Sequence, residues 1–140
     1  MAKKIFVSFD YENDKRYKFL LEAWNENDQF DFTFDDHSSK EINSNEIARV
    51  KAALTRKINS AEITLIIIGK EANKNHPDSN EIGYKNWINF EVAKSIEAKN
   101  SLVAVKINSN YESPEELLGE GASWASSFTE DNIIDALNKI

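Results

Sequence analysis

The sequence predicts an α/β fold, in which an open parallel sheet of about five strands carries helices on both faces. Two observations lead to this prediction. Short apolar runs alternate along the chain with amphipathic segments of helical length, which is the pattern of parallel strands joined by crossover helices. One run, Ile63–Ile68, is apolar at nearly every position, as expected of a strand that is covered on both faces.

The first strand is expected at Lys4–Phe9, which is rich in β-favouring residues and ends at an acidic loop. Asp14, at the end of this loop, is expected to cap a helix over Lys15–Glu26, where apolar residues recur at helical spacing. A short second strand follows at Phe30–Phe34. Phenylalanines alternate there with polar residues, which is typical of a strand near a sheet edge.

The second helix is expected to bury one apolar face and to begin at Ser44 or Asn45, either of which is a suitable cap. Its apolar face consists of Ile47, Val50, Leu54 and Ile58. The central strand Ile63–Ile68 comes next and ends at Gly69. The polar segment Lys70–Lys85 then predicts a long loop of a kind that is often functional.

A third helix is expected over Asn86–Ala98, and a fourth strand over Leu102–Ile107. A weak fifth strand is expected at Trp124–Phe128, before a final helix over Glu130–Lys139 that Thr129 caps. These elements fit a flavodoxin-like sheet with the strand order 2-1-3-4-5. Ligands of such sheets bind at the carboxyl ends of strands one and three, where the order reverses.

The composition indicates one ordinary globular domain that spans residues 1–140. No apolar run is long enough to cross a membrane, and no secretion signal is visible, so a cytoplasmic location is expected. The chain contains no cysteine, which excludes disulfides and cysteine-based metal sites. The net charge of −7 opposes binding to the phosphate backbone of nucleic acids.

The expected carboxyl edge lacks the features of two common kinds of site. The loop after the first strand has no glycine and contains Asp10, Glu12 and Asp14, whose charges would repel a bound phosphate. Flavin and P-loop nucleotide sites are therefore not expected. A phospho-acceptor domain would carry an aspartate at the end of the third strand, where this chain has Ile68 and Gly69.

Metal-dependent and serine-hydrolase chemistry also lack support in the sequence. His37 and His76 lie in polar loops without the spacing of metal ligands, so no metal site is assigned. The G-x-S-x-G motif that presents the nucleophile of many hydrolases is absent. No cofactor is expected.

Glu91 is the remaining candidate for a chemical role. On a helical projection of Asn86–Ala98 it lies about 60° beyond the edge of the apolar stripe, which places it at the margin of the buried face. Trp87 lies one turn earlier on the same side. A purely structural alternative remains open, in which Glu91 is a boundary residue that pairs with Lys94 or Lys85.

Three segments resemble those of TIR-like domains. They are Lys4–Tyr11, Ile63–Gly69 and the helix Trp87–Ile96, which contains the pattern W-x-x-x-E. The similarity extends from the first strand through the fourth, and it is greatest to the TIR-like proteins of the bacterial Thoeris antiphage defence system.

This resemblance implies an enzyme that cleaves the bond between nicotinamide and ribose in NAD. In Thoeris-like members it further implies cyclisation of the product to a cyclic ADP-ribose signal. The glutamate of W-x-x-x-E corresponds to Glu91, which would bind the ribose hydroxyls and stabilise the oxocarbenium charge. NAD is then the substrate rather than a cofactor.

Other residues near the expected carboxyl edge are candidates for substrate binding. Aromatic side chains would exclude water from the site, and acidic side chains after strands one and two would accept hydrogen bonds from ribose or adenine. These candidates are Phe9, Asp10, Tyr11, Asp36 and Trp87.

The resemblance also implies partners. TIR-like enzymes are completed by a neighbouring subunit, so we expect self-association on activation through the polar loop Asp35–Ser44 and a separate effector protein that senses the product. This loop lacks the R-D and glycine elements common in TIR domains. Two alternatives remain open: a catalytically silent TIR-like interaction module, and a flavodoxin-like receptor for a small molecule.

Overall fold

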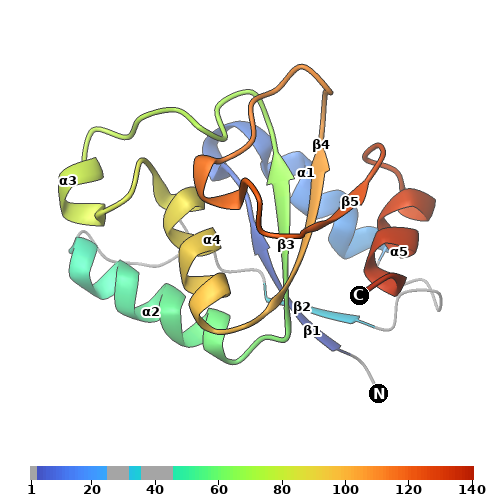
Figure 1. The fold of residues 1–140 in the computed structure, drawn as a ribbon, viewed down its shortest axis with the longest axis horizontal. Coiled ribbons are helices and arrows are strands. Elements are labelled where there is room, and N and C mark those ends of the chain that lie inside the picture. The colour runs from blue at the N-terminus through green and yellow to red at the C-terminus, as the bar shows by residue number, and fades with distance from the viewer. Residues whose placement is uncertain (1–2, 25–31, 36–45) are drawn as a thin grey trace.

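The structure is a computed structural model that describes residues 3–24, 32–35 and 46–140 (Figure 1). These ranges contain five strands, five α-helices and one short 3-10 helix. The strands are β1 (Lys3–Ser8), β2 (Phe32–Asp35), β3 (Ile63–Ile68), β4 (Ser101–Lys106) and β5 (Ser123–Ala125). The helices are α1 (Tyr11–Trp24), α2 (Ile47–Asn59), α3 (Ser79–Ile82), α4 (Trp87–Glu97), η1 (Glu115–Leu117) and α5 (Glu130–Asn138).

The described strands form one sheet in the order β2-β1-β3-β4-β5, and all neighbouring strands are parallel. The open parallel α/β class expected from the sequence is confirmed. β2 lies on one side of β1 and β3 on the other, so the direction in which strands are added reverses at β1. Ser8 at the end of β1 lies opposite Ile66 of β3. The carboxyl ends of β1 and β3 therefore lie at the same edge of the sheet, where the strand order reverses.

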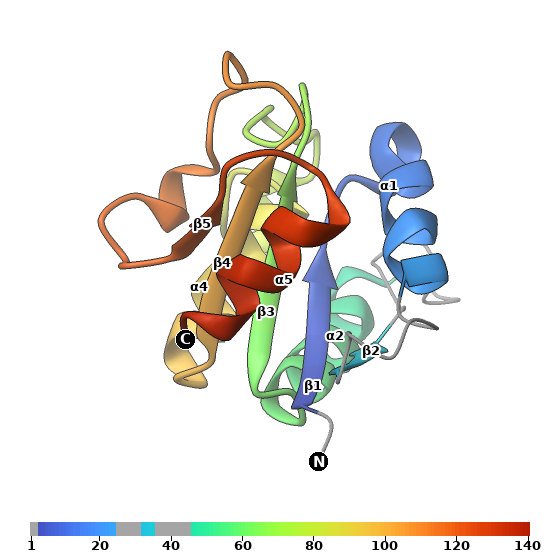
Figure 2. The same cartoon turned by 90° about the vertical axis from the view of Figure 1, so that its right-hand side faces the viewer.

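Helices cover both faces of the sheet (Figure 2). α1 and α5 pack on one face, where their apolar residues join Ile5, Val7 and Phe9 of the β1 region in one core cluster. α2 and α4 pack on the other face, where Phe6 meets residues of both helices. Because side chains alternate along a strand, Ser8 points to the α2 and α4 face, like Phe6.

Helix α1 begins earlier than expected. The backbone N–H of Asp14 donates to the carbonyl oxygen of Asp10 at 2.7 Å, which already closes the first helical turn. The expectation that Asp14 caps this helix is therefore wrong, since Asp14 lies inside it. The first turn is held by Asp10, whose Oδ2 accepts a hydrogen bond from Asn13 Nδ2 at 2.6 Å.

Two further elements differ from the expectation. The long segment Lys70–Lys85 contains the single-turn helix α3, which ends at Gly83 with a φ of 86° that favours glycine. The last strand is displaced toward the N-terminus and is short, with Trp124 exposed on it. Thr129 caps α5 as expected, because its side chain accepts from the N–H of Asn132 at 3.3 Å.

Some expectations concern residues outside the described ranges. Ser44, Asn45 and His37 lie outside the described residues, and so does most of the loop Asp35–Ser44. None of the helices in the described ranges is long and apolar enough to cross a membrane.

Candidate active site

Glu91 lies in the second turn of α4, and only 2% of it is exposed. The expectation that it lies at the margin of the buried face is therefore wrong. Helix α4 packs not only on the sheet but also against α2 and η1, so residues outside its apolar stripe are buried as well. Asn89 and Ser95 are buried on α4 for the same reason.

Ser8 provides the hydrogen bond that holds the Glu91 side chain. Its Oγ donates to Glu91 Oε1 at 2.6 Å, and both residues are buried. This bond joins the carboxyl end of β1 to α4 across the face of the sheet. It therefore fixes a carboxyl group beside the reversal of strand order, where sheets of this type bind their ligands.

Burial changes the acidity of this carboxyl. Loss of hydration raises the pKa of Glu91 from its ordinary value of 4.5 to about 8, and the Ser8 hydrogen bond opposes the rise only in part. The group is thus mostly protonated at neutral pH in the free protein. A cation placed beside it would favour the ionised form and lower its pKa.

A chain of buried hydroxyl groups continues behind Glu91. Ser95 Oγ donates to the carbonyl oxygen of Glu91 at 2.7 Å and lies 2.6 Å from Thr64 Oγ1 on β3. Thr64 is approached in turn by Asn100 Nδ2 at 3.4 Å. These contacts fix the backbone of α4 at Glu91 against β3, so the carboxyl is held by its own helix as well as by β1.

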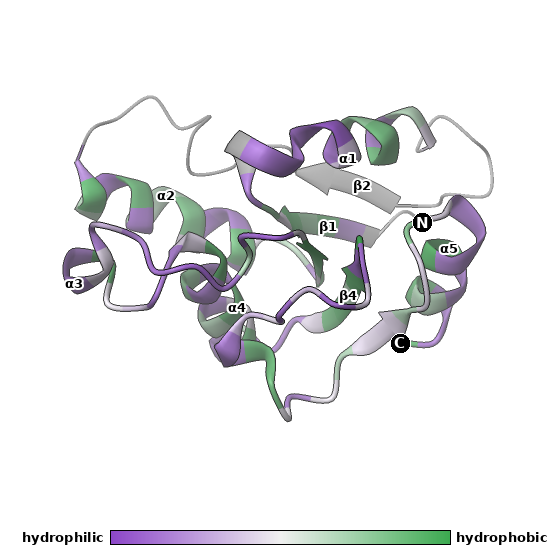
Figure 3. Ribbon diagram, turned by 90° about the horizontal axis from the view of Figure 1, so that it is seen from above, coloured by the Kyte–Doolittle hydropathy of each residue, from purple (hydrophilic) through white to green (hydrophobic). Residues whose placement is uncertain are grey.

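Asparagine side chains fix the N-terminal end of α4. Asn86 caps the helix through a bond from Asn89 N–H at 2.9 Å, and its Nδ2 donates to the carbonyls of Ala72 and Lys74 at 2.8 and 2.9 Å. Asn89 Oδ1 accepts from the N–H of Glu116 in η1 at 3.0 Å. The segment after β3 and the segment after β4 are therefore both anchored to α4, and both are largely hydrophilic (Figure 3).

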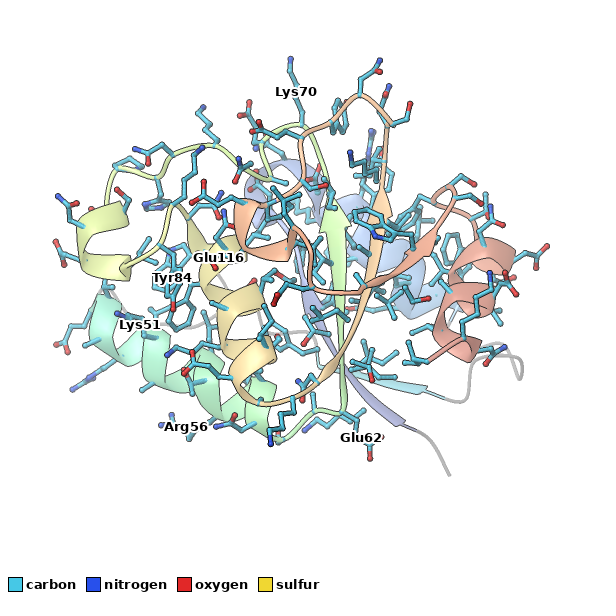
Figure 4. The ribbon with its side chains drawn as sticks, in the orientation of Figure 1. Lys51, Arg56, Glu62, Lys70, Tyr84 and Glu116 are labelled. Carbon is cyan, nitrogen blue, oxygen red and sulfur yellow. The ribbon has the colours of Figure 1, made fainter. Side chains whose placement is uncertain are left out.

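Helix α2 supports α4 from the other side. Lys51 reaches from α2 toward the segment that bears Tyr84 (Figure 4). Its Nζ donates to the carbonyl oxygen of Glu81 at 3.3 Å and lies 5.7 Å from the ring centre of Phe90. Phe90 also meets the rings of Tyr84 and Trp87 edge to face, so aromatic packing holds the residue that precedes Glu91 on α4.

The other candidate residues lie at different places around this edge. Phe9 is 5% exposed and packs in the core cluster of α1 and α5, on the face away from α4. Asp10 lies at the start of α1, and Trp87 is half-buried against Phe90. The side chain of Tyr11 and the whole of Asp36 lie outside the described residues. The roles assigned to these five residues remain predictions.

Ser8 is a residue of the site that the sequence analysis missed. A signal for it existed, because Ser8 is the one uncharged polar residue in the strand Lys4–Phe9. A hydroxyl at a buried strand position needs a hydrogen-bond partner. That requirement points to a polar group on the helix packed against it, but the sequence does not say which helix that is.

The geometry combines one buried carboxyl with a hydroxyl that orients it. In the described ranges, no three His, Asp or Glu side chains are placed to hold a metal ion. A single oriented carboxyl in a site of low polarity is suited to stabilising positive charge on a bound molecule.

A family model described as "Thoeris protein ThsB, TIR-like domain" matches residues 6–112. The chain belongs to this family. The matched range includes the end of β1, all of β3 and α4, and therefore both members of the Ser8–Glu91 pair of this TIR-like domain. No curated protein matches the sequence significantly.

Solved structures share the fold of this TIR-like domain at low sequence identity. A 2-deoxyribosyltransferase from Bacillus psychrosaccharolyticus is 15% identical, with 92% of this chain and 90% of that chain covered and a TM-score of 0.60. A 2-desoxiribosyltransferase from Leishmania mexicana is 9% identical, with coverages of 99% and 98% and a TM-score of 0.61. A prokaryotic SEFIR domain is 13% identical, with coverages of 99% and 89% and a TM-score of 0.53.

The burial of Glu91 predicts how its replacement affects stability. The pKa of Glu91 is raised from 4.5 to about 8 in the folded protein, so between these pH values the carboxyl is ionised in the unfolded chain and still protonated in the folded one. The free energy of unfolding therefore falls as pH rises through this range. Glutamine does not titrate, so Glu91→Gln removes this pH-dependent loss of stability. Urea denaturation should therefore show that the variant gains stability over the parent with rising pH, by on the order of a few kcal/mol at mildly alkaline pH.

Glu97→Gln is a matched control, because Glu97 is on the same helix but exposed, in an ion pair with Lys94 at 3.2 Å. It should show no such gain. Equal pH dependence of stability in the parent and in Glu91→Gln would contradict the burial of an acid with a raised pKa.

Proposed function

We propose that this TIR-like domain cleaves the bond between nicotinamide and ribose in NAD and cyclises the remaining ADP-ribose unit to a signal in antiphage defence. Glu91 is the catalytic carboxylate. The observation that carries the proposal is the buried Ser8–Glu91 pair at the carboxyl end of β1, in a chain of the Thoeris TIR-like family.

The chemistry of NAD fits a site with one carboxyl. When the bond to ribose breaks, its electron pair passes to the pyridinium nitrogen, so nicotinamide leaves as a neutral molecule. No general acid is required, in contrast to a glycosidase, whose leaving oxygen must be protonated. The positive charge develops on the ribose, and a fixed carboxylate next to that sugar stabilises it.

The second half of the reaction supplies a nucleophile to the ribose carbon. In cyclisation, an adenine ring nitrogen of the same molecule forms the new bond, and a proton is released. Water would instead give ADP-ribose. Cyclisation is favoured when the site holds the adenosine end close and excludes water, which a largely buried carboxyl such as Glu91 assists.

The protonation state of Glu91 links substrate binding to catalysis. The free protein holds the group with a pKa raised to about 8, because burial disfavours its charge. The pyridinium of NAD carries a positive charge, so its binding lowers that pKa and releases the proton. The neutral acid thus becomes a carboxylate when the cationic substrate is present.

Two similar structures support a reaction at a sugar–base bond. Both proteins are deoxyribosyltransferases, and the bacterial one is described as a biocatalyst for the synthesis of nucleosides. Transfer of a deoxyribosyl group to make a nucleoside takes place at the bond between a sugar and a base. The proposed reaction of NAD also breaks such a bond.

The proposal includes two kinds of protein partner. A second copy of the chain completes the site through the loop Asp35–Ser44, most of which lies outside the described residues. A separate effector protein then senses the cyclic product. The near-complete burial of Glu91 supports a site that needs rearrangement or a neighbouring subunit before NAD can reach it.

Replacing Glu91 should abolish turnover. Glu91→Gln keeps the shape of the side chain and removes its charge, so nicotinamide release from NAD should fall by about a thousandfold, the scale for loss of a main electrostatic contribution. Chromatography of released nicotinamide measures the rate, and Glu97→Gln should retain the parental rate. Parental turnover by Glu91→Gln would contradict the assignment. Absence of turnover and of NAD binding in the parent, at any protein concentration, would favour the silent interaction module.

Specific activity should depend on protein concentration. If a neighbouring subunit completes the site, nicotinamide release per mole of chain should rise from nanomolar to micromolar protein, in parallel with the oligomer fraction measured by light scattering. Replacement of polar residues in the loop Asp35–Ser44 should abolish this rise without lowering the melting temperature. Constant specific activity of a protein that remains monomeric would show that one chain is sufficient.

A further inference from the structure

Asp14 is a second buried carboxyl at the carboxyl edge of the sheet. It lies in the first part of α1 and is 6% exposed. Its Oδ2 is buried and has no hydrogen-bond partner in the described part of the chain. An unpaired buried oxygen costs free energy, so a ligand that donates a hydrogen bond to it would stabilise this part of the protein.

Gly69 provides the space for this carboxyl. A Cβ at Gly69 would overlap the Asp14 carboxyl group, although the backbone of Gly69 does not have a positive φ. Glycine is therefore required here for space and not for conformation. The end of β3 and the start of α1 thus bring a carboxyl directly against the backbone at the reversal of strand order.

The surroundings of Asp14 are acidic. Burial and the carboxylates of Asp10 and Glu71 raise the pKa of Asp14 to about 6, and Arg16 opposes the rise. The group is therefore mostly ionised at neutral pH. In the described ranges, no three His, Asp or Glu side chains are placed to hold a metal ion. This acidic environment favours a neutral ligand group that donates hydrogen bonds. It repels a phosphate.

The position of Asp14 relative to Glu91 suits two ends of one dinucleotide. Ser8, which holds Glu91, is opposite Ile66, and Gly69 follows three residues later, roughly 10 Å further along the strand. The two carboxyls lie on different faces of the sheet, because α1 and α4 cover different faces. A ligand that reaches both groups must therefore cross the carboxyl edge of the sheet, between the ends of β1 and β3.

We propose that Asp14 accepts hydrogen bonds from the hydroxyls of the adenosine ribose and thereby selects NAD over NADP. This inference rests on the proposed function, in which Glu91 contacts the nicotinamide ribose. A carboxylate accepts hydrogen bonds from a 2′-hydroxyl and repels a 2′-phosphate, so one group both binds the first substrate and rejects the second.

The test is a binding measurement in a Glu91→Gln background, where no turnover disturbs the titration. Calorimetry with NAD and with NADP gives both dissociation constants for Glu91→Gln, which is the parent in this experiment. The same constants are measured for three further variants made in it: Asp14→Asn, Gly69→Ala and Asp135→Asn. Gly69→Ala displaces the Asp14 carboxyl without changing Asp14 itself. Asp135→Asn is the matched control, because Asp135 is exposed on α5. Thermal melting confirms that each variant is folded.

We expect the parent to bind NAD at least tenfold more tightly than NADP. Asp14→Asn should weaken NAD binding by about 10- to 100-fold, the effect of losing hydrogen bonds to a charged group, without weakening NADP binding. Gly69→Ala should do the same, and Asp135→Asn should match the parent. Unchanged selectivity in folded Asp14→Asn overturns this inference alone. If the protein with Glu91 intact neither binds NAD nor releases nicotinamide from it, the proposed function fails and this inference with it.

Discussion

The arrangement of the site depends on the hydrogen bond that joins a buried acid on α4 to the end of β1. Glu91 is 2% exposed and accepts a hydrogen bond from Ser8 at 2.6 Å, which joins the end of the strand to the helix. Burial of a carboxyl costs free energy, and here the protein avoids much of that cost by keeping the group protonated. The surrounding elements must then hold α4 in place. Asn86 holds the start of α4 against the segment that follows β3. The Ser95–Thr64 contact holds the second half of α4 against β3 itself.

Under the proposed function, this arrangement would keep the catalytic group uncharged until a cationic substrate binds. The buried Glu91 carboxyl is protonated and uncharged in the free protein, whereas a bound pyridinium would favour its ionised form. Asp14 differs, because its pKa of about 6 leaves it ionised at neutral pH. The two carboxyls therefore suit different tasks. In the proposed reaction, Asp14 would recognise an uncharged sugar, and Glu91 would become charged next to the bond that breaks.

The sequence was sufficient for the α/β class, because the apolar run Ile63–Ile68 and the alternation of strands with amphipathic helices depend on local pattern alone. It also pointed to Glu91 through the W-x-x-x-E pattern. It misjudged the burial of Glu91, because helical periodicity describes one packed face and α4 is enclosed on several sides. Ser8 and the Asp14–Gly69 contact were missed for a related reason. Each depends on which elements meet in space, and no spacing along the chain encodes that.

If Glu91 is a buried acid that a cationic ligand ionises, its titration must show both properties. A carbon-13 NMR titration of the Glu91 side-chain carboxyl, assigned by comparison with Glu91→Gln, measures them. We expect a midpoint near pH 8 in the free protein and a lower midpoint when nicotinamide mononucleotide, which carries the pyridinium, is bound. A midpoint near 4.5 in the free protein, or no change on saturation with the mononucleotide, would contradict this expectation.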